Sequence, residues 1–347
     1  MVGLFIALLT AGASAADHAV LFVGNSYTQY NAPHSIDGNY AQLLAEGMPA
    51  WEVDSRRYAR GGYNLVRHLG DATGTSELHE FLTDTDTYAW DLVVLQDQSQ
   101  TPGFPHEQDE WIWSRDAAVD LAEMITEAGA TPRLFMTWGY RDGDALNAWR
   151  FPDYPTMQGL LAEGYYAYAE AIVAAGHPVE VVPVGMAWQH IYDGHTAVGE
   201  DPLQSSALFS RLYSGDGSHP SVLGSYLASL VFYTAFTGQS PVGLEWAPEV
   251  ITERDRDALQ QAAEAVMADA LGGGEDTGEG SAGPDDTGDE DTEPGPSGDD
   301  SGEGAAADSG GDVQPEADKS GCSCTVSGGL VPWVAILSVI ALIRSRP

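Results

Sequence analysis

The sequence is poor in lysine and in cysteine. Its 347 residues include one lysine, Lys319, and two cysteines, Cys322 and Cys324, which lie close to the C-terminus. The residues before Cys322 therefore hold no disulfide, no thiolate metal ligand and no cysteine nucleophile. Basic residues number 14 against 52 acidic ones, and they form no run. Phosphate binding needs a basic face, so the composition argues against a nucleic-acid partner.

The negative charge is spread over the whole chain but is densest after residue 270. The formal net charge is -38, of which residues 17–270 carry -25 without a single lysine. Such an excess suits a saline or extracellular setting, where salt screens the repulsion between carboxylates. Codon bias combined with a soluble acidic surface would give the same composition, and the sequence does not separate the two readings.

The first 16 residues have the pattern of a secretory signal. Val2 to Leu9 is apolar, and Ala13-Ser14-Ala15 supplies a small-x-small cleavage site. The segment lacks the usual basic residue near its start, and a buried first strand or helix is the alternative. We expect export and removal of residues 1–16 by a signal peptidase.

Residues 17–271 alternate short β-rich runs with longer runs of helical spacing. The expected strands are 18–23, 51–58, 91–95, 133–137 and 179–184, and the expected helices are 39–48, 107–128, 156–175, 221–236 and 249–270. Alternation of this kind predicts a parallel sheet covered by helices on both faces. We expect one α/β domain, a three-layer α/β/α sandwich with a sheet of about five strands.

Residues 272–320 differ sharply from the domain before them. They contain 13 glycines and 4 prolines but no aromatic residue, so they cannot bury a core. The sequence predicts a disordered acidic linker that self-repulsion keeps extended. A calcium-binding repeat is the alternative, suggested by Asp285-Asp286-Thr287-Gly288-Asp289, but no regular period supports it.

Residues 321–347 combine the cysteine pair with an apolar run and a basic end. The run Leu330–Ile343 precedes Arg344 and Arg346. As a helix it would be about 21 Å long, against about 30 Å for the hydrocarbon core of a bilayer. This arrangement resembles the C-terminal tails that myxosortases recognise. The resemblance implies cleavage by a sorting protease near Cys322 or Cys324 and attachment at the outer surface of a bacterium, with an ordinary membrane anchor as the alternative.

Two motifs at opposite ends of the domain carry nucleophilic chemistry. Gly24-Asn25-Ser26 follows the first expected strand, where open α/β sheets place ligands. Asp216-Gly217-Ser218-His219 precedes the helix that begins near residue 221. A hydroxyl nucleophile needs a base, and the base needs an orienting acceptor, which this second motif can supply. Helix capping by the serine and by the aspartate is the alternative for each motif.

Taken in order, these motifs resemble the SGNH (GDSL-type) hydrolase superfamily over residues 18–240. The matching blocks are VLFVGNSYT, ARGGYNL, DLVVLQDQS and DGSHPSVLGSYLA. The resemblance implies a serine hydrolase with Ser26 as nucleophile, His219 as base and Asp216 as its orienting acceptor. It also implies an oxyanion hole formed by the backbone N–H groups of Ser26 and Gly62, and a reaction that needs no metal or cofactor.

The third block departs from the family pattern. The family has an asparagine there whose amide donates to the oxyanion, whereas this chain has Gln96 and Gln98. These two share one face if the strand continues, and the register favours Gln98. A solvated glutamine at the strand end is the alternative.

Weaker signals concern the substrate and metals. Trp138 and Tyr140 follow the fourth expected strand and could line a substrate cleft, although aromatic residues in such loops commonly belong to the core. The histidines share no metal-ligand spacing, so we expect no metal site. The leading hypothesis is a secreted, surface-attached serine esterase, with carbohydrate O-acetyl groups as one substrate class. A lipase or thioesterase, and a surface-binding protein without activity, remain as alternatives.

Overall fold

The computed structural model describes residues 16–272. The expected acidic linker and sorting tail lie outside these residues, apart from Gly272, and so does the expected signal peptide, apart from Ala16. No helix within the described part of the chain is long and apolar enough to cross a membrane.

Five parallel strands form a single sheet, in the order β2-β1-β3-β4-β5. Their bounds are β1 His18–Gly24, β2 Val53–Ala59, β3 Leu92–Leu95, β4 Thr131–Phe135 and β5 Glu180–Val182. Every residue of β1 is buried, as expected for a central strand with helices on both faces. The order reverses between β1 and β3, which makes their carboxyl ends the switch point of the sheet.

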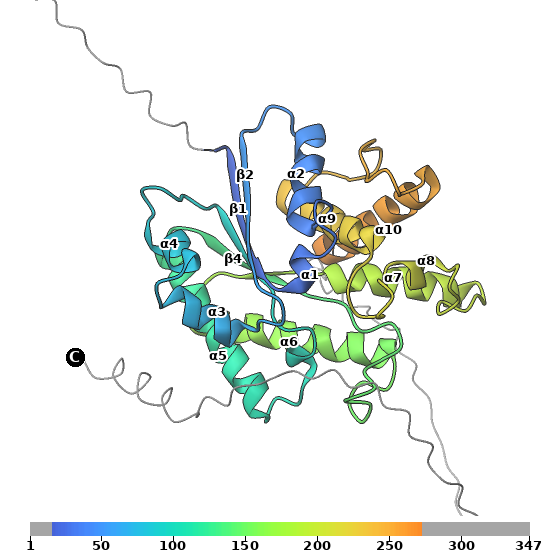
Figure 1. Cartoon of the computed structure of the whole chain (residues 1–347), viewed down its shortest axis with the longest axis horizontal. Coiled ribbons are helices and arrows are strands. Elements are labelled where there is room, and N and C mark those ends of the chain that lie inside the picture. The colour runs from blue at the N-terminus through green and yellow to red at the C-terminus, as the bar shows by residue number, and fades with distance from the viewer. Residues whose placement is uncertain (1–15, 273–347) are drawn as a thin grey trace, which may run out of the picture. The chain divides into compact units, whose positions relative to one another are not determined.

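Two layers of helices cover the sheet, as Figure 1 shows. Along β1, Val20 and Phe22 pack on one side, and Leu21 and Val23 pack on the other, because side chains alternate along a strand. The first layer contains α2 Ile36–Gly47, α7 Val184–Ala197, α9 Val222–Thr237 and α10 Glu253–Gly272. The second contains α3 Leu65–Ala72, α4 Glu77–Thr83, α5 Asp109–Glu127 and α6 Tyr154–Ala174. This is the α/β/α sandwich that the sequence predicts.

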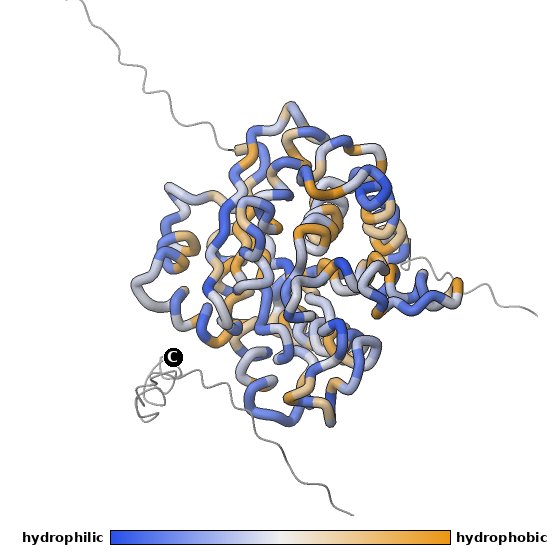
Figure 2. The backbone as a smooth tube through the Cα atoms, turned by 45° about the vertical axis from the view of Figure 1, so that its right-hand side comes forward, coloured by the Kyte–Doolittle hydropathy of each residue, from blue (hydrophilic) through white to orange (hydrophobic). Residues whose placement is uncertain are grey.

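The helices follow the hydrophobic pattern of the sequence. Hydrophobic and hydrophilic residues are interspersed along the helices in Figure 2, and the buried residues of α3 and α5 recur mostly every three or four positions, as on helices with one side toward the core. Helix α9 is the exception, since it is buried on nearly all sides between α2, α7 and α10. Besides two single-turn helices, three helices of residues 16–272 were not expected from the sequence. Helices α3 and α4 are short, and α7 begins immediately after β5, where the apolar run reads as a longer strand.

Parallel strands bring the segments that follow them to one edge of the sheet. The short helix α1 Ser26–Gln29 follows β1, residues 60–64 follow β2, and residues 96–100 precede the 3-10 helix Thr101–Gly103. A further short helix, α8 Leu208–Arg211, precedes residues 212–221, which lead into α9. This edge carries both motifs that the sequence singles out.

Candidate active site

Ser26 occupies the first position of α1, immediately beyond the end of β1. The turn before it is tight: a Cβ on Gly24 would lie 2.6 Å from Oε1 of Gln96. Asn25 caps the helix by accepting a hydrogen bond from the Tyr27 N–H at 3.0 Å. A glycine for close approach and an asparagine for the cap thus fix where the Ser26 side chain emerges.

Asn25 also joins three segments at this edge of the sheet. Its Nδ2 donates to the carbonyl oxygen of Tyr63 at 2.9 Å and to that of Asp97 at 3.3 Å. Tyr63 follows β2 and Asp97 follows β3. The nucleophile turn is therefore held from both sides, and Gly62, next to Tyr63, is brought to the same edge as Ser26.

The loop before α9 carries the candidate base and its partner. One carboxylate oxygen of Asp216 accepts from the backbone N–H groups of Ser218 and His219, both at 2.9 Å. The Ser214 hydroxyl donates to the same oxygen at 2.8 Å. Gly217 has φ +71°, in the region that favours glycine, which lets the chain wrap around the carboxylate.

His219 bridges the two motifs. Its Nδ1 lies 2.7 Å from Oδ2 of Asp216, and its Nε2 lies 2.9 Å from Oγ of Ser26. An ionised carboxylate can only accept, so the proton of the neutral imidazole belongs on Nδ1. Nε2 is then free to accept the Ser26 hydroxyl proton. The structure thus brings together the three residues that the sequence nominates from positions almost 200 residues apart.

The Asp216 carboxylate favours its ionised form. Partial burial alone would raise its pKa, but the hydrogen bonds from the Ser218 and His219 N–H groups, the imidazole and the Ser214 hydroxyl lower the pKa well below its usual value. Asp216 still has 45% of its side chain exposed, compared with 27% for His219. The Asp216–His219 pair therefore carries a negative charge on the carboxylate and is in contact with water.

Two backbone N–H groups near Ser26 are available to an added ligand. Within residues 16–272, neither the Ser26 N–H nor the Gly62 N–H donates a hydrogen bond to another protein group. Gly62 has φ +71° and is exposed in a turn closed by Tyr63 N–H donating to Arg60 O at 3.1 Å. Both groups can serve the anion-stabilising role that the family resemblance implies.

Neither glutamine supplies the third donor that the sequence analysis expects. Strand β3 ends at Leu95, so the assumed strand register does not extend to residue 98. The Gln98 amide donates to Ser99 Oγ and Gln100 Oε1, while its oxygen accepts from the Gln100 N–H. Gln96 is buried; its oxygen accepts from the Asn25 N–H at 2.9 Å, and its amide donates to Asp97 O. Both side chains brace the backbone of this edge instead.

Trp138 and Tyr140, the two residues expected to line a substrate cleft, lie in different surroundings. Trp138 is fully buried and stacked between Tyr27 and Trp188, with ring centroids 4.7 and 4.2 Å apart. Its assignment to a substrate cleft is therefore wrong, and it belongs to the core. Tyr140 is half-buried, and its hydroxyl lies 2.8 Å from Oγ of Ser99. A role for Tyr140 in substrate binding stays a prediction.

Sequence reasoning missed three residues that support the site. Tyr30 stacks on the His219 ring, and Asn31 donates to the carbonyl oxygen of Pro220. Asp97 is fully buried and accepts from four donors that tie the end of β3 to the second helix layer. Only Asp97 lies in a motif, DLVVLQDQS, that could have drawn attention to it.

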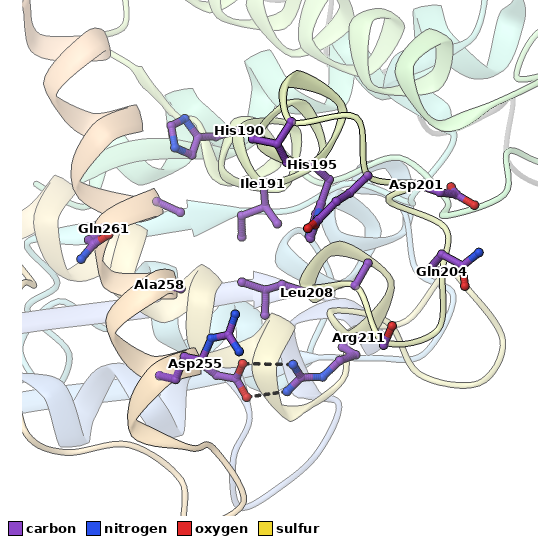
Figure 3. A pocket seen from close by; sticks show the side chains of 17 residues that line it. His190, Ile191, His195, Asp201, Gln204, Leu208, Arg211, Asp255, Ala258 and Gln261 are labelled. Carbon is purple, nitrogen blue, oxygen red and sulfur yellow. Dashed lines mark hydrogen bonds and ion pairs between the residues drawn. The ribbon is translucent and has the colours of Figure 1, made fainter.

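Two of the recesses in the described surface are lined by none of the motif residues. One, of about 720 Å³, lies between α7, α8 and α10, where Arg211 and Asp255 form an ion pair (Figure 3). None of its lining residues belongs to either motif. The other, of about 500 Å³, is lined by Phe104, Trp113 and Trp149 together with polar side chains. No group of three or more metal-ligating side chains that could hold an ion occurs in residues 16–272.

The chain matches no protein-family model and no curated protein. Among solved structures it is similar to a DUF4886 family protein from Bacteroides uniformis, with 17% identity and a TM-score of 0.53 over 72% of this chain and 94% of that chain. At this identity the likeness shows the fold alone.

Two further structures are similar over smaller parts of the chain. A candidate SGNH hydrolase from Slackia heliotrinireducens has 28% identity and a TM-score of 0.44, over 63% of this chain and 98% of that chain. The acetylxylan esterase Axe2 from Geobacillus stearothermophilus has 14% identity and a TM-score of 0.41, over 67% and 98%. We draw no conclusion about activity from either.

Proposed function

We propose that the protein is a serine esterase that hydrolyses acyl esters through Ser26, His219 and Asp216. The observation that carries the proposal is the unbroken chain of hydrogen bonds from Asp216 through the imidazole to the Ser26 hydroxyl, at 2.7 and 2.9 Å. Nucleophile, base and orienting acceptor in this order are the parts that acyl transfer to serine requires.

The geometry gives each group one task. His219 Nε2 accepts the Ser26 proton as Oγ attacks the ester carbonyl, and Asp216 keeps the other ring proton on Nδ1. The imidazolium then protonates the leaving alcohol, so an acyl-enzyme remains. His219, neutral again, removes a proton from water, which releases the acid and restores the serine.

The negative charge that develops on the carbonyl oxygen needs donors. The free N–H groups of Ser26 and Gly62 are the candidates, and removal of one such donor typically costs about 3 kcal/mol of barrier stabilisation. We assign the hole to these two backbone groups, because the glutamine amides are engaged elsewhere.

An ester on a carbohydrate is the substrate class that one surface feature favours. The 500 Å³ cleft presents Trp113 and Trp149, which are 51% and 67% exposed, beside Asp109, Glu110 and Asn147. Exposed aromatic faces next to hydrogen-bonding side chains suit a ligand that is apolar on its ring faces and polar at its edges. The net charge of -25 on residues 17–270 favours a neutral polymer over an anionic one.

Export and surface attachment belong to the same proposal. They rest on residues 1–16 and 321–347, whose sequence patterns suit a signal peptidase and a sorting protease. Mass spectrometry of the surface protein from its host tests this part: a chain that still ends at Pro347 would mean a retained anchor.

The decisive experiment combines turnover with covalent labelling. Wild type should hydrolyse p-nitrophenyl acetate and butyrate, and a fluorophosphonate should add to the peptide that contains Ser26. Ser26→Ala should lose both reactions while keeping the wild-type fold. Ser218 provides the matched control, because its hydroxyl lies 3.5 Å from Nδ1 on the other side of the imidazole. Labelling of Ser218, or activity in Ser26→Ala close to wild type, would contradict the assignment.

The same series separates the alternatives. A lipase or thioesterase would favour longer acyl chains or thioesters over acetyl esters. A surface-binding protein without activity would show neither turnover nor labelling, although the hydrogen bonds among Ser26, His219 and Asp216 are formed.

A further inference from the structure

The segment that follows the nucleophile helix contacts the base loop at two points. The Tyr30 ring stacks on the His219 imidazole, with centroids 4.7 Å apart and planes inclined by 22°. Nδ2 of Asn31 donates to the carbonyl oxygen of Pro220 at 2.9 Å and to Oγ of Ser225 at 3.0 Å. One contact reaches the ring and the other reaches the backbone beside it.

Asn31 adopts an uncommon backbone conformation to make these bonds. Its φ is +64°, and it is the one non-glycine residue with positive φ among residues 16–272. Asparagine tolerates the left-handed region better than most residues, yet such positions persist only where surrounding contacts hold them. The two hydrogen bonds of its side chain are those contacts.

The base loop is held at three consecutive carbonyl groups. Trp138 Nε1 donates to the carbonyl oxygen of Ser218 at 3.0 Å. The Ser214 N–H donates to that of His219 at 2.9 Å. Nδ2 of Asn31 donates to that of Pro220. The first comes from the core and the second from the loop itself. Asn31 alone among these donors belongs to the segment that carries Ser26, so it links that segment directly to the base loop.

The imidazole ring has two aromatic neighbours of different character. Tyr27 meets it edge-on at 5.5 Å and is itself buried and stacked on Trp138. Tyr30 covers a face of the ring and is 37% exposed, so the core does not hold it in place. Its position depends on the turn that Asn31 anchors.

We propose that Tyr30 and Asn31 act as a positioning clamp for His219. The inference rests on the proposed function, because a clamp on the base matters when the base must act twice. In the acyl-enzyme the Ser26 oxygen carries no proton to donate, so the imidazole loses that hydrogen bond. The Asp216 bond then restrains the ring within its plane, and the Tyr30 face restrains it out of plane while water approaches.

Four variants test the clamp against wild type. Tyr30→Leu removes the ring, and Tyr30→Phe keeps it. Asn31→Asp keeps the shape but cannot donate to Pro220 O, and Asn31→Gly keeps the positive φ without the side chain. We expect Tyr30→Leu and Asn31→Asp to lower kcat by roughly 10- to 100-fold with KM nearly unchanged, the loss that a small misplacement of a reacting group produces. Asn31→Gly also lacks the Nδ2 donor, so its kcat should decrease about as much as that of Asn31→Asp.

Tyr30→Phe should stay within about twofold of wild type, because stacking uses the ring. Within the described residues the Tyr30 hydroxyl makes no hydrogen bond. A phenylalanine variant as slow as the leucine variant would overturn the stacking argument. A leucine variant in which KM rises and kcat is kept would also overturn the clamp, since Tyr30 would then be a substrate contact.

A double-mutant cycle separates positioning from a general loss of structure. In the His219→Ala background, Tyr30→Leu should change the residual hydrolysis rate by less than about twofold, because its effect acts through the missing imidazole. A drop of the same size in both backgrounds would contradict the clamp.

A measurement that needs no turnover keeps the clamp and the proposed function distinguishable. The ring protons of His219 should show a ring-current shift from Tyr30 in NMR spectra of wild type and Tyr30→Phe, and this contribution should be lost in Tyr30→Leu, where the contribution of the edge-on Tyr27 remains. The shift without any ester hydrolysis would mean that the stacking is real and the proposed function fails. Ester hydrolysis without the shift would mean that the proposed function holds and that the clamp fails.

Discussion

Two aspartates near the candidate site accept several hydrogen bonds, four for Asp97 and five for Asp216, yet their ionisation is driven in opposite directions. Asp97 is fully buried, and burial raises its pKa although Ser114, the Leu65 and Gln98 N–H groups and Tyr168 all donate to it. Asp216 is about half exposed, and similar donors hold its pKa well below the usual range. Hydrogen bonds favour the carboxylate in both places, so the difference comes from desolvation. The number of donors alone therefore does not reveal which aspartate serves chemistry.

The two aspartates also differ in which parts of the protein their hydrogen bonds connect. Ser114 Oγ of α5, the Leu65 N–H of α3 and Tyr168 Oη of α6 donate to Asp97 at 2.6, 3.0 and 3.2 Å. Asp97 thus joins three helices of one layer to the end of β3, whereas Asp216 serves a single loop and one imidazole. We interpret Asp97 as a structural support and Asp216 as the orienting acceptor.

Replacing Asp216 should give the largest effect. Asp216→Ala should lower kcat/KM by about 10³- to 10⁴-fold, because the imidazole loses the partner that fixes its tautomer and orientation. Ester hydrolysis and urea unfolding measured on the same preparation check this, and the loss of stability should be smaller than in Asp97→Ala, because Asp216 is about half exposed to solvent. Gln98→Ala is the control at the same edge and should keep activity within about threefold, since the side chain of Gln98 forms its hydrogen bonds with residues 99–101 and not with the three site residues. A larger loss in Gln98→Ala than in Asp216→Ala would reverse our reading of the site.

Replacing Asp97 should instead affect folding. Asp97→Ala should lower the free energy of unfolding by about 3–5 kcal/mol, because it leaves several buried donors without an acceptor. Asp97→Asn should be milder, since the amide oxygen still accepts from the Leu65 and Gln98 N–H groups. Urea titrations at pH 7 measure both. If Asp97→Ala proved as stable as wild type while losing turnover, Asp97 would belong to the chemistry.

The smallest effect is a difference in pH dependence. The lowered pKa of Asp216 gives stability that is present above about pH 4 and is lost as pH falls below it. The raised pKa of Asp97 gives stability that is present below about pH 4 and is lost as pH rises above it. Relative to wild type, Asp216→Asn should therefore gain stability toward low pH, and Asp97→Asn should gain stability toward neutral pH. Urea unfolding from pH 3 to 7 compares the three proteins, and parallel curves would remove the distinction between the aspartates.

The sequence predicts the sheet well, because buried parallel strands are continuous apolar runs bounded by turn residues. The family resemblance implies that Ser26, Asp216 and His219 act together, whereas the strand pattern itself places only Ser26 at the end of a strand. Prediction from the sequence fails where side chains decide the local path. Gln98 caps a turn with its own oxygen, an arrangement that strand periodicity does not reveal.

Contacts between distant residues explain the other failures. Nothing near Trp138 in the sequence indicates that Tyr27 and Trp188 will enclose it. Tyr30 and Asn31 carry no motif, and their importance follows only from the loop that folds against them from the far end of the domain.

The exposure of Asp216 has a consequence for what can accept the acyl group. An acyl-enzyme can pass its acyl chain to water or to a competing alcohol or amine, and the outcome depends on which of them reaches the imidazole. Here the outer side of the carboxylate–imidazole pair is in contact with solvent, since Asp216 is 45% and His219 27% exposed. Bulk water therefore reaches this pair directly, so the proposed mechanism needs no internal water channel for release of the free acid.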